Sequence, residues 1–176
     1  MRLGTRSRLA TTILALLTST ACNRAPVTEW HQVNAPDGTF SVTLPGNPVK
    51  EDTPTKSVTG GSFVSHSFKT RSSKSAGNAG YACAWWEDPT LKARTPEQIL
   101  DSLRDNALSS IQGELLEEKR LTIQGHPGRD IRAVVRGHDY DNRILVVGNR
   151  VYSLMIVGEK RDSKNVAKFF DSLILH

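Results

Sequence analysis

Two consecutive apolar runs near the C-terminal end, residues 144–147 and 151–157, constrain the fold more than any other feature. Gly148-Asn149 lies between them and has the composition of a tight two-residue turn, which predicts a β-hairpin. Side chains alternate in direction along a strand, and in the second run Ser153 is the only polar residue on either face. An antiparallel sheet with one face in water is normally polar on that face. The sequence therefore predicts a sheet that is covered on both faces.

Two amphipathic segments are predicted to supply the covers. In the first, Thr95 can cap a helix, Pro96 fits the first helical position and Gln98 completes a capping box. The apolar residues of this segment fall on one side over about four turns: Ile99, Leu100, Leu103, Ala107 and Ile111. The second helix is capped by Asp162 or Ser163, and its apolar residues recur at helical spacing: Val166, Phe169, Phe170 and Leu173. The predicted fold class is α+β, an α/β/α sandwich with a central antiparallel sheet flanked by helices.

The remaining patterns predict further strands and turns. Pro36-Asp37-Gly38 is typical of a turn, and it precedes an alternating strand that contains Phe40, Val42 and Leu44. Other strands are predicted for an alternating run after Gly61, for 81–86 and for 131–135. Residues 125–128 are predicted as a turn and 137–142 as a loop, whereas the polar residues 49–60 give no clear pattern.

The N-terminal 21 residues are predicted to be an export signal. Three arginines precede the apolar stretch Leu9–Leu17, which is too short to span a bilayer, and small residues lead to Cys22. The sequence Ser19-Thr20-Ala21-Cys22 resembles the lipobox of bacterial lipoproteins, which predicts that Cys22 carries a lipid. The same residues also satisfy the small-x-small rule of an ordinary signal peptidase, so plain secretion stays open. The predicted organisation is a signal in 1–21, a lipidated cysteine and tether in 22–28, and one domain in 29–176.

Charge and the second cysteine restrict the partners of this domain. Loss of Arg2, Arg6 and Arg8 with the signal lowers the formal net charge from +5 to +2, which gives no reason to expect a nucleic-acid partner. Cys83 lies in an apolar strand pattern and is predicted to be a free buried thiol, with a disulfide to Cys22 as the alternative. We expect a monomer.

Five segments of the chain resemble the PsbP-like superfamily. They are an FSVTLPG opening, the capped helix, a GHPGRD turn, the VGNRVYSLMIVG hairpin and a closing AKFFDSLIL, within residues 30–174. The superfamily includes photosystem proteins, a eukaryotic Ran-binding transport factor and bacterial lipoproteins, and the resemblance is to the lipoproteins. It implies an α/β/α sandwich whose members act mainly by binding other proteins, and it supplies no shared catalytic motif.

Candidate site residues are few. No GxSxG elbow, phosphate-binding loop or Cys-His pair is present, and the residues His138–Asp141 are better explained as a solvated loop than as metal ligands. We therefore expect no enzyme activity, no metal and no cofactor. The weak candidates for partner binding are Trp85 and Trp86, which lie on opposite faces of a strand, and Arg129 and Arg150, from an arginine-rich region with interspersed acids. Core packing of the tryptophans and a mixed charged surface are the alternatives.

The predicted function is that of an exported, membrane-anchored lipoprotein facing the periplasm or the cell exterior. Its domain would bind an envelope protein or act in assembly. A small-ligand-binding protein is the main alternative, and an envelope hydrolase is the weaker one. A flat apolar patch near one tryptophan would favour the first function, and an apolar pocket with a few convergent polar groups would favour the second.

Overall fold

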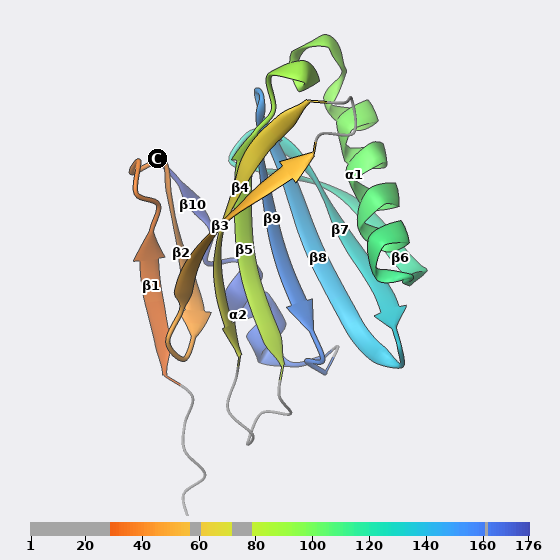
Figure 1. Ribbon diagram of the computed structural model, residues 1–176. Helices are drawn as coiled ribbons and strands as arrows, with labels where there is room; N and C mark the ends of the chain where they lie inside the picture. The colour runs from red at the N-terminus through yellow and green to blue at the C-terminus, as the bar shows by residue number, and fades with distance from the viewer. Residues whose placement is uncertain (1–28, 57–60, 72–78, 161) are drawn as a thin grey trace, which may run out of the picture.

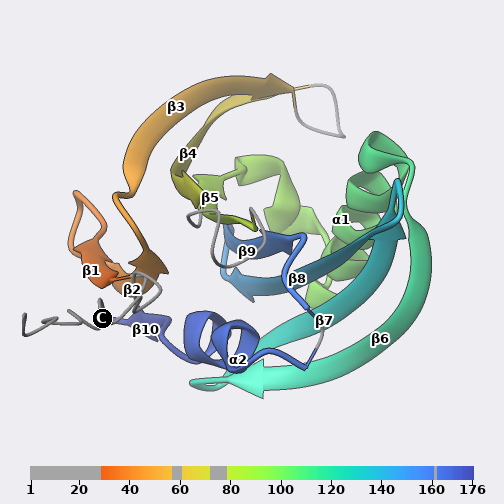
Figure 2. The same cartoon turned by 90° about the horizontal axis from the view of Figure 1, so that it is seen from below.

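The computed structural model describes residues 29–56, 61–71, 79–160 and 162–176, and its central element is a curved antiparallel sheet of seven strands (Figure 1). In sheet order the strands are β3 (Val49–Lys56), β4 (Ser62–Arg71), β5 (Gly80–Glu87), β9 (Arg150–Val157), β8 (His138–Val147), β7 (His126–Val135) and β6 (Glu114–Ile123). Seen from below, the edge strand β3 arches toward the side on which helix α1 (Pro96–Ile111) lies (Figure 2). The sheet therefore has a sheltered face and an opposite face.

The predicted C-terminal hairpin forms the middle of this sheet. Strands β8 and β9 are joined by Gly148-Asn149, and Val147 pairs with Arg150 directly across the turn. Gly148 has a φ of 61°, a conformation that glycine adopts without steric cost. Val151 is buried on one face and Leu154 on the other, both with 0% exposure. The prediction that this hairpin is covered on both faces is confirmed.

Helix α1 covers part of one face. Its capping box forms as predicted: the Thr95 hydroxyl accepts a hydrogen bond from the Gln98 amide, and the Gln98 side chain accepts one from the Thr95 amide. A 3₁₀ helix, η2 (Pro89–Ala93), precedes α1. Together they bury an apolar cluster against β7, β8 and β9: Leu91, Ile99, Leu100, Ile131, Ile144, Val146 and Val151.

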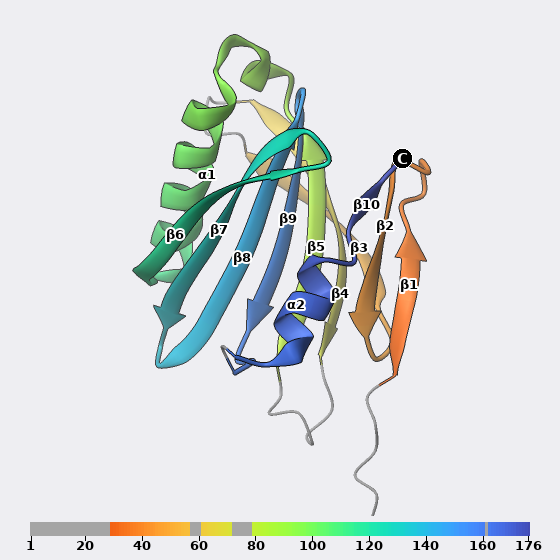
Figure 3. The ribbon, with the colours of Figure 1, turned by 180° about the vertical axis from the view of Figure 1, so that it is seen from behind.

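The opposite face is covered mainly by a second sheet (Figure 3). This sheet consists of β1 (Trp30–Asn34), β2 (Phe40–Pro45) and β10 (Ile174–Leu175), and helix α2 (Lys164–Phe170) lies beside it. Phe40, Val42 and Leu44 of β2 are fully buried here together with Phe169 of α2. The larger core of the domain lies between the two sheets.

The predicted α/β/α sandwich is therefore wrong. The described part of the chain is mostly β, with antiparallel sheets of three and seven strands and only two α-helices. The alternation of Phe40, Val42 and Leu44 was correctly predicted as a strand, but this strand forms its own layer with β1 and β10. Helix α2 has only seven residues, so it covers a small part of the face beside that sheet.

Two predicted turns lie elsewhere. Strand β8 begins at His138, and the turn before it is Arg136-Gly137, where both residues have positive φ. Likewise β7 begins at His126, so Gly128 lies inside a strand and not in a turn. A Cβ atom on Gly128 would lie 2.6 Å from the carbonyl oxygen of Ile144, so this position requires glycine for a close approach of two strands.

The predicted export signal and tether lie outside the described residues. Within the described residues, neither helix has the length and apolarity needed to cross a membrane.

Candidate binding groove

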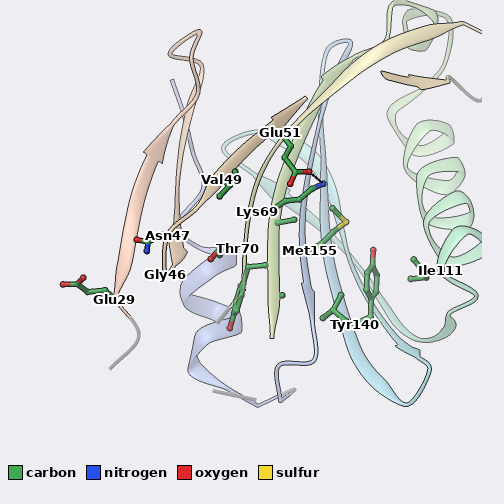
Figure 4. Close-up of a pocket in the computed structure, with 14 residues that line it drawn as sticks. Glu29, Gly46, Asn47, Val49, Glu51, Lys69, Thr70, Ile111, Tyr140 and Met155 are labelled. Atoms are coloured by element: carbon green, nitrogen blue, oxygen red, sulfur yellow. Dashed lines mark hydrogen bonds and ion pairs between the residues drawn. The ribbon is translucent and has the colours of Figure 1, made fainter. Parts of the chain in front are cut away.

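A groove of about 990 Å³ lies mainly on the face of the large sheet that carries α1, in the part that α1 leaves open, and Thr70 and Tyr81 from the other face also line it (Figure 4). We call it the α1-face groove. One wall is formed by β3 and β4, and Ile111 at the C-terminal end of α1 forms part of the other. The lining residues are Glu29, Gly46, Asn47, Val49, Glu51, Lys69, Thr70, Gly80, Tyr81, Ala82, Ile111, Tyr140, Met155 and Val157.

Small side chains on β5 leave space on this face of the sheet, in the α1-face groove at Ala82 and in a neighbouring hollow at Ala84. Successive strand residues point to opposite faces, so β5 directs Ala82 and Ala84 toward α1 and directs Tyr81, Cys83 and Trp85 into the core between the sheets. Helix α1 packs on β7 and β8, so it does not fill the space above β5. Over β5 the floor of the groove is therefore formed by small apolar side chains.

A smaller hollow of about 280 Å³ lies beside the α1-face groove, and Met155 lines both. Ala107 and Ser110 of α1, Phe63 of β4 and Trp86 of β5 are among its lining residues. Met155 lines both spaces, so they are neighbours, and we refer to the two together as the path beside α1.

A short chain of hydrogen bonds brings a polar group to this path. Ser153 donates to the Asn142 side-chain oxygen at 2.9 Å, and the Asn142 amide donates to the Tyr140 hydroxyl at 3.0 Å. All three side chains are buried. Burial raises the pKa of Tyr140 to about 12, so the hydroxyl keeps its proton near neutral pH. Because the Tyr140 oxygen accepts from Asn142, its own hydrogen is available to donate to a ligand on the side that Figure 4 shows facing the groove.

The two candidate tryptophans have different surroundings. Trp85 is 4% exposed and packs in the core between the sheets, with its ring 5.0 Å from Phe40 and 5.2 Å from Phe68. Trp86 is half-buried on the other face, stacks on Phe63 at 5.8 Å and lines the smaller hollow. Trp85 is thus a core residue, and only Trp86 lies on the path beside α1.

The two candidate arginines bind acids of their own chain. Arg129 is 1% exposed, and its guanidinium contacts Glu97 at 2.8 Å and also Asp101 and Glu118. Arg150 contacts Glu87 at 2.6 Å and Asp37 at 2.8 Å. These contacts hold α1 and β6 to β7 in the first case, and β5 and the β1–β2 turn to β9 in the second. Arg129 is therefore not part of an exposed basic surface, because its guanidinium is buried beneath the partly exposed carboxylates that it pairs.

Cys83 is a free thiol in the core between the sheets, and burial raises its pKa. Cys22, the predicted lipidation site, lies outside the described residues. Asp139–Asn142, predicted to be part of a loop, lie in β8. Within the described part of the chain, no three His, Cys, Asp or Glu side chains are grouped so as to hold a metal ion.

Comparison with known proteins identifies the fold. No family model matches the chain. No curated protein sequence matches it either. Among solved structures, the chain is similar to the solution structure of cyanobacterial PsbP (CyanoP) from Synechocystis sp. PCC 6803, with a TM-score of 0.55 and 10% sequence identity over 89% of this chain and 98% of that one. The chain has a PsbP-like fold. This structural similarity confirms the resemblance to the PsbP-like fold that was seen in the sequence. The layers of the domain differ from the helix-flanked sandwich that was expected.

Proposed function

We propose that the PsbP-like domain is a membrane-tethered binding protein of the cell envelope that holds an apolar ligand in the α1-face groove. Residues 1–21 would export the chain, and Cys22 would anchor it by a lipid so that the domain faces the periplasm or the cell exterior. The observation that carries the binding role is the groove itself. Its volume of about 990 Å³, and a lining that sets Val49, Ala82, Met155 and Val157 beside polar side chains, are typical of sites for small ligands.

A protein partner is the second candidate, and the edge strand β3 favours it. Strand β3 pairs only with β4 within the described sheet, so its outer edge presents backbone groups to which an extended segment can pair. Val49 at the start of β3 is 59% exposed and lines the groove. In this case an envelope protein would add a strand to β3, and its side chains would enter the α1-face groove.

Photo-crosslinking in cells tests the binding role. A photoreactive amino acid at Ser110, which is exposed and lines the smaller hollow, is expected to form an adduct with the bound molecule. The same amino acid at Asp105, an exposed position on α1 that lines neither space, is the matched control and is expected to form none above background. The mass of each adduct is measured by mass spectrometry.

The adduct mass separates the two candidates. A small adduct at Ser110 supports the apolar ligand, whereas an adduct of protein size that also forms from β3 supports the envelope partner. Equal labelling at Ser110 and Asp105 would count against a binding role for this face of the domain.

The tether is tested at Cys22. Cys22→Ala is expected to abolish labelling of the chain by a fatty-acid probe and to release it from membranes, because the thiol is the predicted acyl acceptor. Membrane fractionation and in-gel detection of the probe are the measurements. Cys83→Ala is the control and should leave both unchanged, since that thiol is buried in the core. Persistent labelling and membrane association of Cys22→Ala would rule the tether out.

A further inference from the structure

The α1-face groove reaches the point at which the described chain begins. Glu29, the first described residue, lines the groove together with Gly46 and Asn47. Figure 4 shows these three at one end of the groove and Tyr140 and Ile111 at the other. Glu29 follows Cys22 by seven residues, and a chain of that length spans at most about 25 Å. An anchor on Cys22 would therefore keep this end of the groove within about 25 Å of the membrane surface.

Between the two ends the lining is partly apolar, and it is interrupted by the Glu51–Lys69 ion pair. Val49, Ala82, Met155 and Val157 lie along it, and Val157 is 40% exposed although its side chain is apolar. Exposed apolar surface of this kind in a concave site marks a place where an apolar molecule is taken out of water. A hydrocarbon chain fits this lining, since it needs no hydrogen bonds along its length.

The charges at the groove exclude an anionic head group. The charged lining residues are Glu29, Glu51 and Lys69, which sum to a net charge of −1. The Lys69 ammonium is already paired with Glu51 at 2.7 Å, so it is not a free cation for a phosphate or a carboxylate. The polar group at the far end is the uncharged Tyr140 hydroxyl, which can donate to an ester or hydroxyl oxygen. The electrostatics thus favour a ligand with one uncharged acceptor.

We infer that the α1-face groove takes the single hydrocarbon chain of an uncharged lipid, such as a monoacylglycerol, drawn from the leaflet beside the tether. The inference rests on the proposed function. The lipid would enter at the Glu29 end, its oxygen atoms would reach the Tyr140 hydroxyl, and its chain would lie over Ala82 and Met155. No covalent step is involved.

Photolabelling from vesicles tests this inference. Two probes are presented in phosphatidylcholine vesicles: a monoacylglycerol with a photoreactive group in its chain, and the fatty acid with the same chain. The full exported chain and its Cys22→Ala variant are each illuminated with either probe, and labelled residues are mapped by mass spectrometry. The monoacylglycerol is expected to label β5, β9 and α1. The fatty acid is expected to label about tenfold less, because its carboxylate would lose hydration beside the buried Tyr140 hydroxyl without gaining a cation as partner.

Filling variants locate the label. Ala82→Phe narrows the α1-face groove and is expected to reduce labelling of β5 and β9. Ala107→Phe narrows the adjoining hollow and is expected to reduce labelling of α1. Ala93→Phe places the same side chain at an exposed site outside both spaces and should leave labelling unchanged. Circular dichroism of each variant shows that the fold is kept, and labelling of the unsubstituted chain decides the question where a filling variant does not fold.

Three results would overturn the inference. Absence of labelling in the unsubstituted chain and in Cys22→Ala would exclude the lipid. Labelling that Ala82→Phe and Ala93→Phe reduce equally would place it outside the groove. If the probe labelled Cys22→Ala but not the unsubstituted chain, the acyl group on Cys22 of the unsubstituted chain would itself occupy the groove. If any of these occurred while Ser110 still formed a specific adduct in cells, the binding function would stand and only the lipid would be rejected.

Discussion

Replacing Phe40 with alanine is expected to lower the free energy of unfolding by about 4 kcal/mol. Phe40 is fully buried between the two sheets, with its ring 5.0 Å from Trp85 and 5.4 Å from Tyr152. The substitution removes the burial of the ring and leaves a cavity that neighbouring strands can fill only in part. Equilibrium unfolding in urea, followed by tryptophan fluorescence, measures the change.

Phe63→Ala is the control for this change. Phe63 is half-buried and packs on Trp86 at 5.8 Å on the other face of the sheet, so its loss should cost much less. Equal effects of the two substitutions would mean that the second sheet adds little to the stability of the domain. That result would contradict the description of this interface as the larger core.

Replacing Arg129 with methionine is expected to cost about 2 kcal/mol of unfolding free energy at neutral pH, because hydrogen bonds to charged groups are lost while Glu97 and Asp101 stay half-exposed to water. Methionine keeps much of the side-chain volume and removes a guanidinium whose Nε has no hydrogen-bond partner in the described structure. It also leaves Glu97, Asp101 and Glu118 without the cation on which they converge. Urea unfolding provides the value. Arg120→Met is the control, because Arg120 is largely exposed and lies 3.6 Å from Glu97, a pair expected to be worth less than about 1 kcal/mol.

The cost of Arg129→Met is expected to depend on pH. A hydrogen bond from Arg129 is the main reason that the pKa of Asp101 lies below its ordinary value of 3.8. A lowered pKa in the folded state adds stability that is complete above the unfolded pKa and is lost as the pH falls through the folded one. The difference in stability between the unsubstituted chain and Arg129→Met should therefore shrink below about pH 4. A difference that stayed constant down to pH 2 would show that packing, and not charge, causes the effect.

Local features of this fold were predictable where one short segment decides them. The Gly148-Asn149 turn and the Thr95 capping box depend on neighbouring residues alone, and both form as predicted. The layer to which a strand belongs depends on distant partners. The pattern of Phe40, Val42 and Leu44 indicates one buried face, but it cannot show that β10, from the end of the chain, pairs with β2 to complete a separate sheet.

The polar strand β8 shows why a loop was predicted in its place. Tyr140 and Asn142 are polar for a buried strand, but each is paired within a hydrogen-bond chain that ends at Ser153 on β9. The burial of Arg129 was also missed, because its charge is paired by side chains that are distant in the sequence. Its acid partners come from α1 and β6, and no sequence spacing reveals that these elements meet at β7.

The α1-face groove was missed, although a signal for it exists in the sequence. Small residues recur at alternate positions of β5, where Ala82 lines the groove and Ala84 lines the smaller hollow. On one face of a covered sheet such residues predict a space that large side chains do not fill. The sequence could not show whether a helix would fill it, because that depends on where α1 ends.

The strand order also has a kinetic consequence. Strands β6 to β9 pair each with the next along the chain, and so do β3 to β5, whereas the junction between the two groups joins Glu87 to Arg150 and Gly80 to Val157. Closing so long an intervening segment costs loop entropy, and the pairing of β2 with β10 spans a longer segment still, so these two long-range pairings are expected to limit the rate of folding. A chain that is threaded through a membrane from its N-terminus cannot make the junction until β9 has emerged. If the chain is exported as proposed, the large sheet would be completed only after β9 has crossed the membrane.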